Sequence, residues 1–335
     1  MKTNGDDAVK VVPVRHVGQW VAASIAMLIV AMIIHTLFSK IPTGQYTCRV
    51  TDGIRKCRPI TEWRFSWDVV FRYFTTSEIL HGLLLTLELT VLSMFVGIFL
   101  GIVIAVMRLS TNRVLSMTAW TYTWFFRGTP VLVQLFVWVY IALLYPTLSI
   151  GIPFTSVTLL HFATKTLFTP FVAALVALGL NEGAYMSEIA RAGLIAVDEG
   201  QIEAATSIGM TRRQTLVYVM IPQAMRVIIP PTGNEVISML KTSSLASTIS
   251  VIELLGAAGN IYANNYLIMP LLIVASLWYL IVTTVLSTGQ FYVERYFAKG
   301  ALRTPPPTPI QRLRRDVAGI LSKFRTPRGT VGARP

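Results

Sequence analysis

The sequence predicts an all-α protein that crosses a membrane several times, and three properties of the chain support this. Hydrophobic residues make up 53% of its 335 residues and charged residues only 13%, and the mean hydropathy of +0.60 is too high for a soluble domain of this length. The apolar residues form long blocks instead of recurring with the period of a half-exposed helix or strand. The net charge of +13 comes from basic residues in loops and tails. Such residues orient a membrane protein, so we expect membrane lipid, and not nucleic acid, as the partner of this chain.

The first apolar block covers residues 20–38 and, at about 1.5 Å per residue, is long enough to cross a hydrocarbon core of about 30 Å. It is longer than the apolar region of a usual signal peptide and lacks a small-residue cleavage site. We therefore interpret residues 18–38 as a retained transmembrane helix that follows a cytoplasmic arm, residues 1–17. The hydrophilic residues 39–77 are expected to form a periplasmic loop. Cys48 and Cys57, the two cysteines of the chain, lie in this loop, and one such pair is consistent with a disulfide or with two free thiols.

Five further apolar blocks are candidates for membrane-spanning helices: residues 82–107, 118–145, 170–191, 227–250 and 269–288. The first two are joined by a short polar turn and predict a helical hairpin, and the third starts with Pro170, which suits the first turn of a helix. The loop before Pro170 predicts short interfacial structure. The fourth block is weakly apolar and must be shielded by protein, and Pro230-Pro231 weaken its start. Residues 298–335 form a basic, Pro-rich tail that we expect to be disordered.

Six spans place both chain termini on the same side of the membrane. The distribution of Lys and Arg over the loops favours cytoplasmic termini, but this excess depends on the arginines of the tail, because the first outer loop is itself basic. The predicted orientation therefore depends more on residues 196–224, which are amphipathic and far too polar to cross the membrane.

Residues 203–222 carry a pattern with fixed spacing: Glu203-Ala204-Ala205, three residues, Gly209, nine residues, and an apolar-x-apolar-Pro ending at Pro222. This pattern predicts two short helices with a bend at Gly209, the second covering residues 212–221 and limited by Pro222. The small alanines let a partner's backbone approach, and Glu203, Arg212 and Arg213 are available for charged contacts, so we expect docking into a groove of another protein. An amphipathic helix on lipid headgroups is the alternative, but it requires neither the Ala pair nor the Gly at a fixed distance.

The pattern resembles the EAA loop of binding-protein-dependent ABC importer permeases, with Val219 and Ile221 where the family more often has Ile and Leu. Further motifs resemble those of the polar amino acid, histidine/glutamine permease-like, members: Phe126-Arg127-Gly128-Thr129-Pro130 followed by Val131-Leu132-Val133-Gln134, Gly183-Ala184-Tyr185, Glu188, Arg191-Ala192-Gly193, Asn234-Glu235 and Lys241-Thr242-Ser243-Ser244-Leu245. The resemblance implies a five-helix ABC type I importer permease core over residues 78–297. It also implies a cytoplasmic coupling loop at residues 196–224, and it leaves the extra N-terminal transmembrane helix unexplained.

The resemblance also implies a function and partners. The chain would be the permease subunit of an importer that moves a polar amino acid across the bacterial inner membrane by alternating access. Two copies of an ABC ATPase would hold ATP and Mg and dock on the coupling loops, and a periplasmic or lipid-anchored amino-acid-binding protein would deliver the substrate. A second copy or a homologous permease would complete a homodimer or heterodimer. The chain itself has no Gly-x-x-x-x-Gly-Lys-Ser/Thr segment, so we expect no cofactor and no metal in it.

Ionisable residues inside the apolar blocks are candidates for the transport pathway, because charges in lipid are costly unless they face protein or water. Four of them lie roughly 14 to 22 Å from the nearer end of their helices, close to the middle of the membrane: Arg127, Glu182, Glu235 and Lys241. We expect Arg127 to bind a carboxylate and Glu182 or Glu235 an ammonium group, with Asn181 and Asn234 as hydrogen-bonding neighbours.

Several alternatives stay open at this point. Arg127 could pair with Glu182 or Glu235 as a buried helix contact, and Lys241 could belong to a helix end. An ion-coupled secondary amino acid transporter would also carry charges in the membrane, but it would need no docking loop. A channel has less support because no filter segment is present. An enzyme has least support, because the histidines are scattered without a metal or catalytic spacing: His16, His35, His81 and His161.

Overall fold

The structure, a computed structural model, describes residues 17–51, 54–63, 65–151 and 158–297, with residues 311, 314, 315 and 318 of the tail. Most of the predicted N-terminal arm and C-terminal tail lie outside the described residues. The chain divides into two units, Met1–Tyr73 and Phe74–Pro335, and each is described by itself.

The first unit contains one long helix, one hairpin and nearly all of the short helix α2 (Trp67–Phe74). Helix α1 (Val17–Leu37) corresponds to the predicted N-terminal helix, and its exposed apolar side chains, such as Met27 and Met32, are those of a helix that faces lipid. Strands β1 (Lys40–Thr51) and β2 (Ile54–Trp63) pair antiparallel with Cys48 directly opposite Cys57. These strands were not predicted. A disulfide between the two cysteines stays a prediction.

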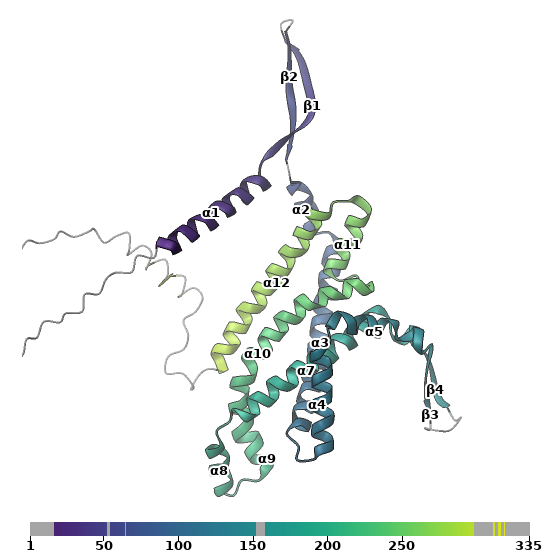
Figure 1. Cartoon of the computed structure of the whole chain (residues 1–335), viewed down its shortest axis with the longest axis vertical. Coiled ribbons are helices and arrows are strands. Elements are labelled where there is room, and N and C mark those ends of the chain that lie inside the picture. The colour runs from purple at the N-terminus through teal and green to yellow at the C-terminus, as the bar shows by residue number, and fades with distance from the viewer. Residues whose placement is uncertain are drawn as a thin grey trace, which may run out of the picture. The chain divides into compact units, whose positions relative to one another are not determined.

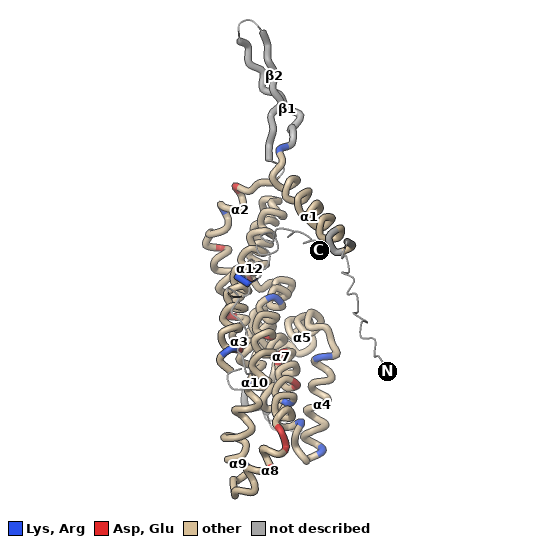
Figure 2. Tube along the Cα trace, turned by 90° about the vertical axis from the view of Figure 1, so that its left-hand side faces the viewer, with Lys and Arg blue, Asp and Glu red and all other residues tan. Residues whose placement is uncertain are grey.

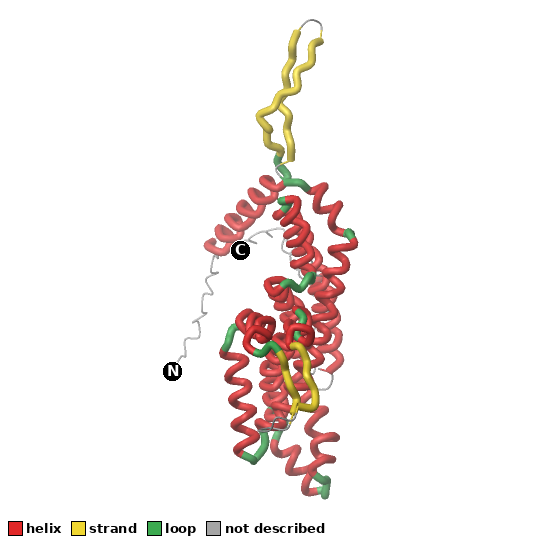
Figure 3. The backbone as a smooth tube through the Cα atoms, turned by 90° about the vertical axis from the view of Figure 1, so that its right-hand side faces the viewer, coloured by secondary structure: helices red, strands yellow, loops and turns green. Residues whose placement is uncertain are grey.

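The second unit is a helical bundle, so the predicted fold class is confirmed for the described residues (Figures 1 and 3). Its main helices are α3 (Ser77–Arg108), α4 (Arg113–Gly128), α5 (Val131–Leu144), α7 (Pro170–Ile195), α10 (Ile221–Thr242), α11 (Leu254–Asn265) and α12 (Ile268–Phe297). Shorter elements are α2 (Trp67–Phe74), which begins in the first unit, the hairpin β3 (Thr147–Gly151) and β4 (Thr158–Ala163), α6 (Thr164–Leu167), α8 (Glu199–Ser207), α9 (Arg212–Gln214), the π-helical turn η1 (Thr215–Met220) and the 3-10 helix η2 (Ser243–Ile249).

Two helices of the described chain, α3 and α12, are long and apolar enough to cross a membrane by themselves. Two further spans arise if bent pairs are each counted as one, namely α4 with α5, bent by 103°, and residues 212–249 with α11, bent by 43°. Helix α7 is not among these, and the apolar part of α1, Val21–Leu37, is shorter. Four spans are therefore supported by length and composition, and the count of six stays a prediction.

The prediction of one continuous third span over residues 118–145 is wrong. Helix α4 ends at Gly128 and α5 begins at Val131. Pro130 explains the break, because it has no N–H to donate to a helix and it disfavours helical backbone at the residue before it, Thr129. Thr129 is indeed extended, with φ −108° and ψ 141°.

The predicted helix end at Pro222 is also wrong. After α9 the chain continues through η1 directly into α10, and Pro222 lies in the first turn of α10. The Ile221 N–H donates to the Leu216 carbonyl five residues back, which is the wider π-helical spacing. A wider turn relieves the clash between a proline ring and the preceding turn, so the helix passes through Pro222 without ending.

Helix α7 is the centre of the bundle and packs against α3, α4, α5 and α10, most extensively against α3. Small residues make this approach possible. A Cβ atom at Gly97 of α3 would overlap with the side chain of Glu182, and one at Gly101 would overlap with Met186. Apolar residues such as Leu89 and Leu178 fill the surrounding core. The close packing of α3 and α7 therefore places Glu182 inside the bundle.

Candidate functional site

A cavity of about 490 Å³ lies where the α4–α5 break meets α7 and α10. Its walls come from the break (Arg127, Gly128, Thr129, Pro130 and Val131), from α7 (Leu178, Asn181, Glu182 and Tyr185) and from α10 (Glu235, Ser238, Met239 and Thr242). Charged residues are sparse along these helices (Figure 2), yet the cavity collects one arginine and two glutamates. A membrane bundle keeps such groups only where they face protein, water or a ligand.

The structure brings together four of the six residues that the sequence analysis assigned to the pathway. Arg127, Asn181, Glu182 and Glu235 all line the cavity. Asn234 and Lys241 do not line it, and their part in the transport pathway stays a prediction. The Asn234 side chain accepts a hydrogen bond from Gln290 of α12 at 3.0 Å, and Lys241 lines a separate depression with Ser276 and Tyr279.

The α4–α5 break is held open by two side chains that bind its free carbonyl groups. Gln134 is buried and its Nε2 donates to the carbonyl oxygens of Phe126 and Thr129 at 3.0 and 3.1 Å, and to the Thr129 hydroxyl at 2.8 Å. Asn181 of α7 donates to the same Phe126 carbonyl at 2.9 Å and to Gln134 Oε1 at 3.3 Å. Unpaired carbonyls are costly in a membrane, so these amides explain how the break persists beside the cavity.

Replacing Gln134 with Leu should therefore destabilise the bundle. The change removes the side-chain donor to the Thr129 carbonyl, one of the two donors to the Phe126 carbonyl, and one of the two acceptors of the Asn181 amide. This loss should lower the free energy of unfolding by about 1 to 3 kcal/mol. Thermal unfolding in detergent measures this loss. Gln201→Leu is the matched control, because Gln201 is exposed on α8; equal stability of the two variants would contradict this role for Gln134.

The charged groups of the cavity are not paired with one another. The two ion pairs found in the described part of the chain both involve Glu188 and neither involves Arg127, Glu182 or Glu235. The Arg127 guanidinium lies over the Tyr185 ring, 5.2 Å from its centroid. Glu182 is 4% exposed, and within the described chain its Oε1 has no hydrogen-bond partner. The alternative of a purely structural Arg–Glu pair thus has no support in this geometry.

The segment around Gly209 forms the predicted bend, which we call the docking elbow (α8, Ile208–Thr211, α9 and η1). Gly209 has φ +82°, and the N–H groups of Gly209 and Met210 donate to the carbonyls of Thr206 and Ala205. This is a Schellman motif, which closes α8 and requires left-handed backbone at the glycine. Thr211 and Gln214 then form a capping box that starts α9.

The surface of the elbow agrees only in part with the sequence analysis. Four of the predicted docking residues on the elbow are exposed, namely Glu203, Ala204, Arg212 and Arg213, and Pro222, which follows the elbow in α10, is exposed as well. Ala205 is buried at 4% exposure, so Ala204 alone of the Ala pair presents its methyl group outward. Ile208 and Tyr218 are 78% and 72% exposed. These apolar side chains on the elbow were missed by the sequence analysis, although they are the kind of residue that a docking groove covers.

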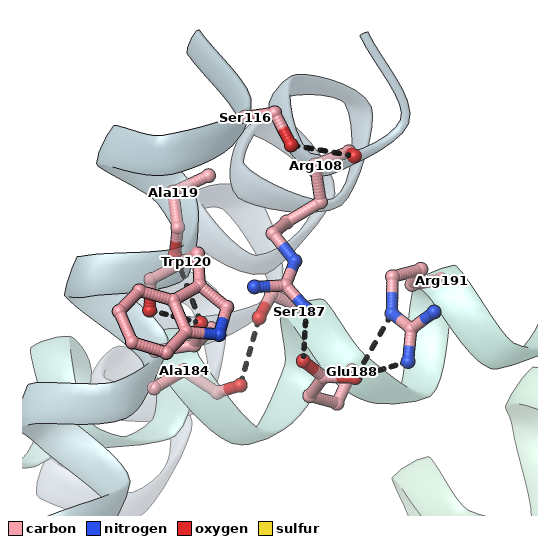
Figure 4. Close-up of polar contacts among 9 residues, drawn as sticks. Arg108, Ser116, Ala119, Trp120, Ala184, Ser187, Glu188 and Arg191 are labelled. Atoms are coloured by element: carbon pink, nitrogen blue, oxygen red, sulfur yellow. Dashed lines mark hydrogen bonds and ion pairs between the residues drawn. The ribbon is translucent and has the colours of Figure 1, made fainter. Parts of the chain in front are cut away.

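A cluster of ion pairs ties the C-terminal end of α3 to α7 (Figure 4). Glu188 lies between two arginines, with Arg108 at 3.4 Å and Arg191 at 2.8 Å. The Ser116 hydroxyl of α4 donates to the Arg108 carbonyl at 3.3 Å, which adds the third helix. Glu188 and Arg191 were noticed as family motif residues, and their structural role here is to hold three helix ends together.

A second buried carboxylate, Glu253, was overlooked by the sequence analysis. Its Oε1 accepts from the Gly256 N–H at 2.8 Å and caps α11, and its Oε2 accepts from Thr86 and Tyr279 at 3.2 and 2.8 Å. Glu253 thus joins α3, α11 and α12, and its oxygens are satisfied. The available signal was an acidic residue placed three positions before the N–H that it caps.

Comparison with known proteins shows that the chain is similar to membrane transport proteins. Residues 97–299 match the family described as binding-protein-dependent transport system inner membrane component. An arginine transport system permease protein of Corynebacterium glutamicum is 42% identical over 293 residues, which cover 87% of this chain and 84% of that protein. An L-cystine transport system permease protein of Bacillus subtilis is 40% identical over 230 residues, covering 68% of this chain and 90% of that protein.

A solved structure, described as an amino acid ABC transporter with histidines, shares 35% sequence identity and a TM-score of 0.56, covering 65% of this chain and 94% of that chain. The fold and the site define a membrane transport subunit. The chain belongs to the family of binding-protein-dependent transport system inner membrane components. It is therefore a permease subunit located in a membrane and not an enzyme, and the matches give no support to an ion-coupled secondary transporter.

Proposed function

We propose that this chain is the inner-membrane permease of an importer for polar amino acids. The observation that carries the proposal is the cavity itself, where a guanidinium and two carboxylates face one space inside a membrane bundle. Arg127 would bind a substrate carboxylate and the glutamates a substrate ammonium group. The arginine and cystine permeases to which the chain is similar support this class of substrate.

The energy for transport would come from a separate ABC ATPase that docks on the elbow. The exposed residues Glu203, Arg212 and Arg213 provide charge for this contact, and Ile208 and Tyr218 provide apolar surface. An ATPase is cytoplasmic, so the elbow and both chain termini would lie on the cytoplasmic side. A periplasmic or lipid-anchored binding protein would deliver the substrate from the other side.

Two copies of the permease would be needed to present two elbows to two ATPase subunits, which hold ATP and Mg, and a symmetric homodimer is the simplest arrangement. A heterodimer with a homologous permease would satisfy the same requirement. The copy numbers are part of this proposal.

A continuous helical segment joins the elbow to the cavity, and it suggests how a movement of the docked ATPase reaches the substrate site. Residues 212–249 run through η1 and α10, and Glu235 on α10 lines the cavity. Movement of the elbow would therefore shift Glu235 relative to Arg127 and Glu182, which belong to other helices. This lever would alternate the cavity between outward and inward exposure.

Uptake by cells that express the chain together with an ABC ATPase and an amino-acid-binding protein tests the proposal. Radiolabelled polar amino acids should accumulate, and accumulation should stop when ATP is depleted but survive collapse of the proton gradient. Uptake that survives ATP depletion and collapses with the proton gradient would instead support ion coupling and overturn the proposal.

A further inference from the structure

The mechanism proposed above makes no use of the hairpin β1–β2 or of its two cysteines. Cys48 and Cys57 are the two cysteines of the chain, and the hairpin places them directly opposite each other. The sequence left their state open, because two cysteines in one loop are consistent with a disulfide or with free thiols. The register of the strands adds the information that the sequence lacked.

The short connection between the strands fixes the register that brings the cysteines together. Asp52-Gly53 separate the strands in the sequence, and Asp-Gly is a preferred sequence for a two-residue hairpin connection. Thr51 and Ile54 are the first opposite pair, and Cys48 and Cys57 each lie three residues further along their strands. The register is unbroken from the first pair to the cysteines.

The cysteines also occupy the kind of pair that suits a disulfide. Hydrogen-bonded and non-hydrogen-bonded pairs alternate along an antiparallel ladder, and the pair that closes a two-residue connection is hydrogen-bonded. Counted from Thr51 and Ile54, the pair of Cys48 and Cys57 is the third one along and is therefore non-hydrogen-bonded. The Cα atoms of such a pair are about 4.5 Å apart, within the range of about 4.4 to 6.8 Å that a disulfide spans.

The strands have little else to hold this register. Within the described residues their sheet has two strands, and an isolated two-stranded hairpin is marginally stable in water. Arg49 lies opposite Lys56, and like charges directly opposite each other are destabilising. Pro59, which lies opposite Tyr46, has no N–H to donate to the ladder. A covalent bond between the strands offsets these costs, because it restricts the unfolded hairpin.

We propose that Cys48 and Cys57 form an intramolecular disulfide that joins β1 to β2. The inference rests on the orientation given in the proposed function: with the N-terminus in the cytoplasm and α1 across the membrane, residues 39–77 lie on the extracytoplasmic side, where disulfides form and persist. No histidine lies between His35 and His81 in the sequence, so the cysteine pair lacks the further nitrogen or sulfur ligands of a structural zinc site.

Formation of this disulfide is a two-electron oxidation. Each thiol loses one hydrogen as the S–S bond forms, and the two protons and two electrons pass to the disulfide of an extracytoplasmic thiol–disulfide oxidoreductase, which becomes a dithiol. One cysteine attacks the enzyme's disulfide as a thiolate and forms a mixed disulfide, and the second cysteine then displaces the enzyme's thiolate. The register of the hairpin places the second cysteine opposite the first for this step.

Mass spectrometry of the full-length chain tests the proposal. Membranes from expressing cells are quenched in acid, free thiols are blocked with iodoacetamide in denaturant, and the chain is digested with trypsin without reduction. Cys48 then lies in the peptide of residues 41–49 and Cys57 in that of residues 57–64, because Arg58 is followed by proline. We expect one linked species that reduction separates into these two peptides. Two separate alkylated peptides, or a dimer of the chain that reduction splits, would overturn the proposal.

A variant with one cysteine moved by one position tests whether the register directs the bond. The double substitution Cys57→Ser and Arg58→Cys keeps two cysteines in the chain. The second one then lies opposite Thr47 and on the other face of the sheet from Cys48. We expect loss of the linked species and alkylation of both thiols in this variant. A yield of linked peptides equal to that of the unmodified chain would overturn the assigned geometry.

A single-cysteine variant separates failure of this proposal from failure of the proposed orientation. Cys48→Ser leaves Cys57 as the one cysteine of the chain, and a maleimide that cannot cross the membrane should label it in intact cells. Labelling of Cys57 together with free thiols in the unmodified chain would remove the disulfide and leave the orientation intact. Labelling that occurs only after the cells are broken would place the hairpin in the cytoplasm and overturn both.

Discussion

Replacing Gly209 with Val is expected to abolish ATP-driven uptake while the amount of chain in the membrane stays the same. Gly209 has φ +82°, a backbone conformation that costs a β-branched residue about 1 to 3 kcal/mol. The substituted elbow would lose its Schellman hydrogen bonds and the angle between α8 and the following helix would change. The bundle would still fold, because a Cβ atom at Gly209 meets nothing within 4 Å.

Uptake of a radiolabelled amino acid and immunodetection of the chain in isolated membranes measure the two effects separately. Gly209→Asn is the matched control, because Asn adopts left-handed backbone more easily than other non-glycine residues and should keep most of the uptake. Full uptake by Gly209→Val would show that the bend at this residue is not needed for coupling. Equal loss in both variants would show that the side chain, and not the backbone angle, is the cause.

The docking elbow could be predicted because its signals are local. Glu203, Gly209 and Pro222 are close in sequence, and a glycine after a short helix reports a backbone angle directly. The continuation of the helix through Pro222 could not be predicted. It depends on a π-helical turn, which no single residue type in the segment indicates.

The α4–α5 break, in contrast, depends on contacts between residues that are far apart in the sequence. Pro130 was visible in the sequence, but the block around it, residues 118–145, is largely apolar and long enough for one span. The break also depends on Asn181, which is 55 residues away from the Phe126 carbonyl that it binds. Hydrogen bonds between distant segments are absent from periodicity and spacing, so the sequence offered no measure of them.

The sequence analysis considered the depth of the charged residues along their helices, but it did not consider their direction around the helix. Each residue rotates a helix by about 100°, so positions three, four and seven residues apart share a face. Ser238, Met239 and Thr242 stand in this relation to Glu235 and line the cavity with it. Asn234 and Lys241 lie one residue before and six residues after Glu235, and they face elsewhere. Applying this rotation to α10 would have predicted that Asn234 and Lys241 do not line the same cavity wall as Glu235.

The contact between α3 and α7 leads to the last prediction, since it determines where Glu182 lies. Gly97→Ala should destabilise the bundle by about 1 to 3 kcal/mol, the usual cost of forcing an extra carbon into a packed interior. The added Cβ would overlap with the Glu182 side chain, so α3 must shift or Glu182 must leave its position in the cavity. Either movement should strongly reduce uptake.

Gly289→Ala is the control for this change, because it is the same substitution in a long apolar helix and a Cβ there meets nothing within 4 Å. It should leave stability unchanged or raise it by about 0.5 to 1 kcal/mol, since Ala favours helix more than Gly does. Unfolding in detergent and uptake by cells compare the two variants. If Gly97→Ala matched Gly289→Ala in both measurements, the close approach of α3 and α7 would not be what fixes the carboxylate of Glu182 in the cavity.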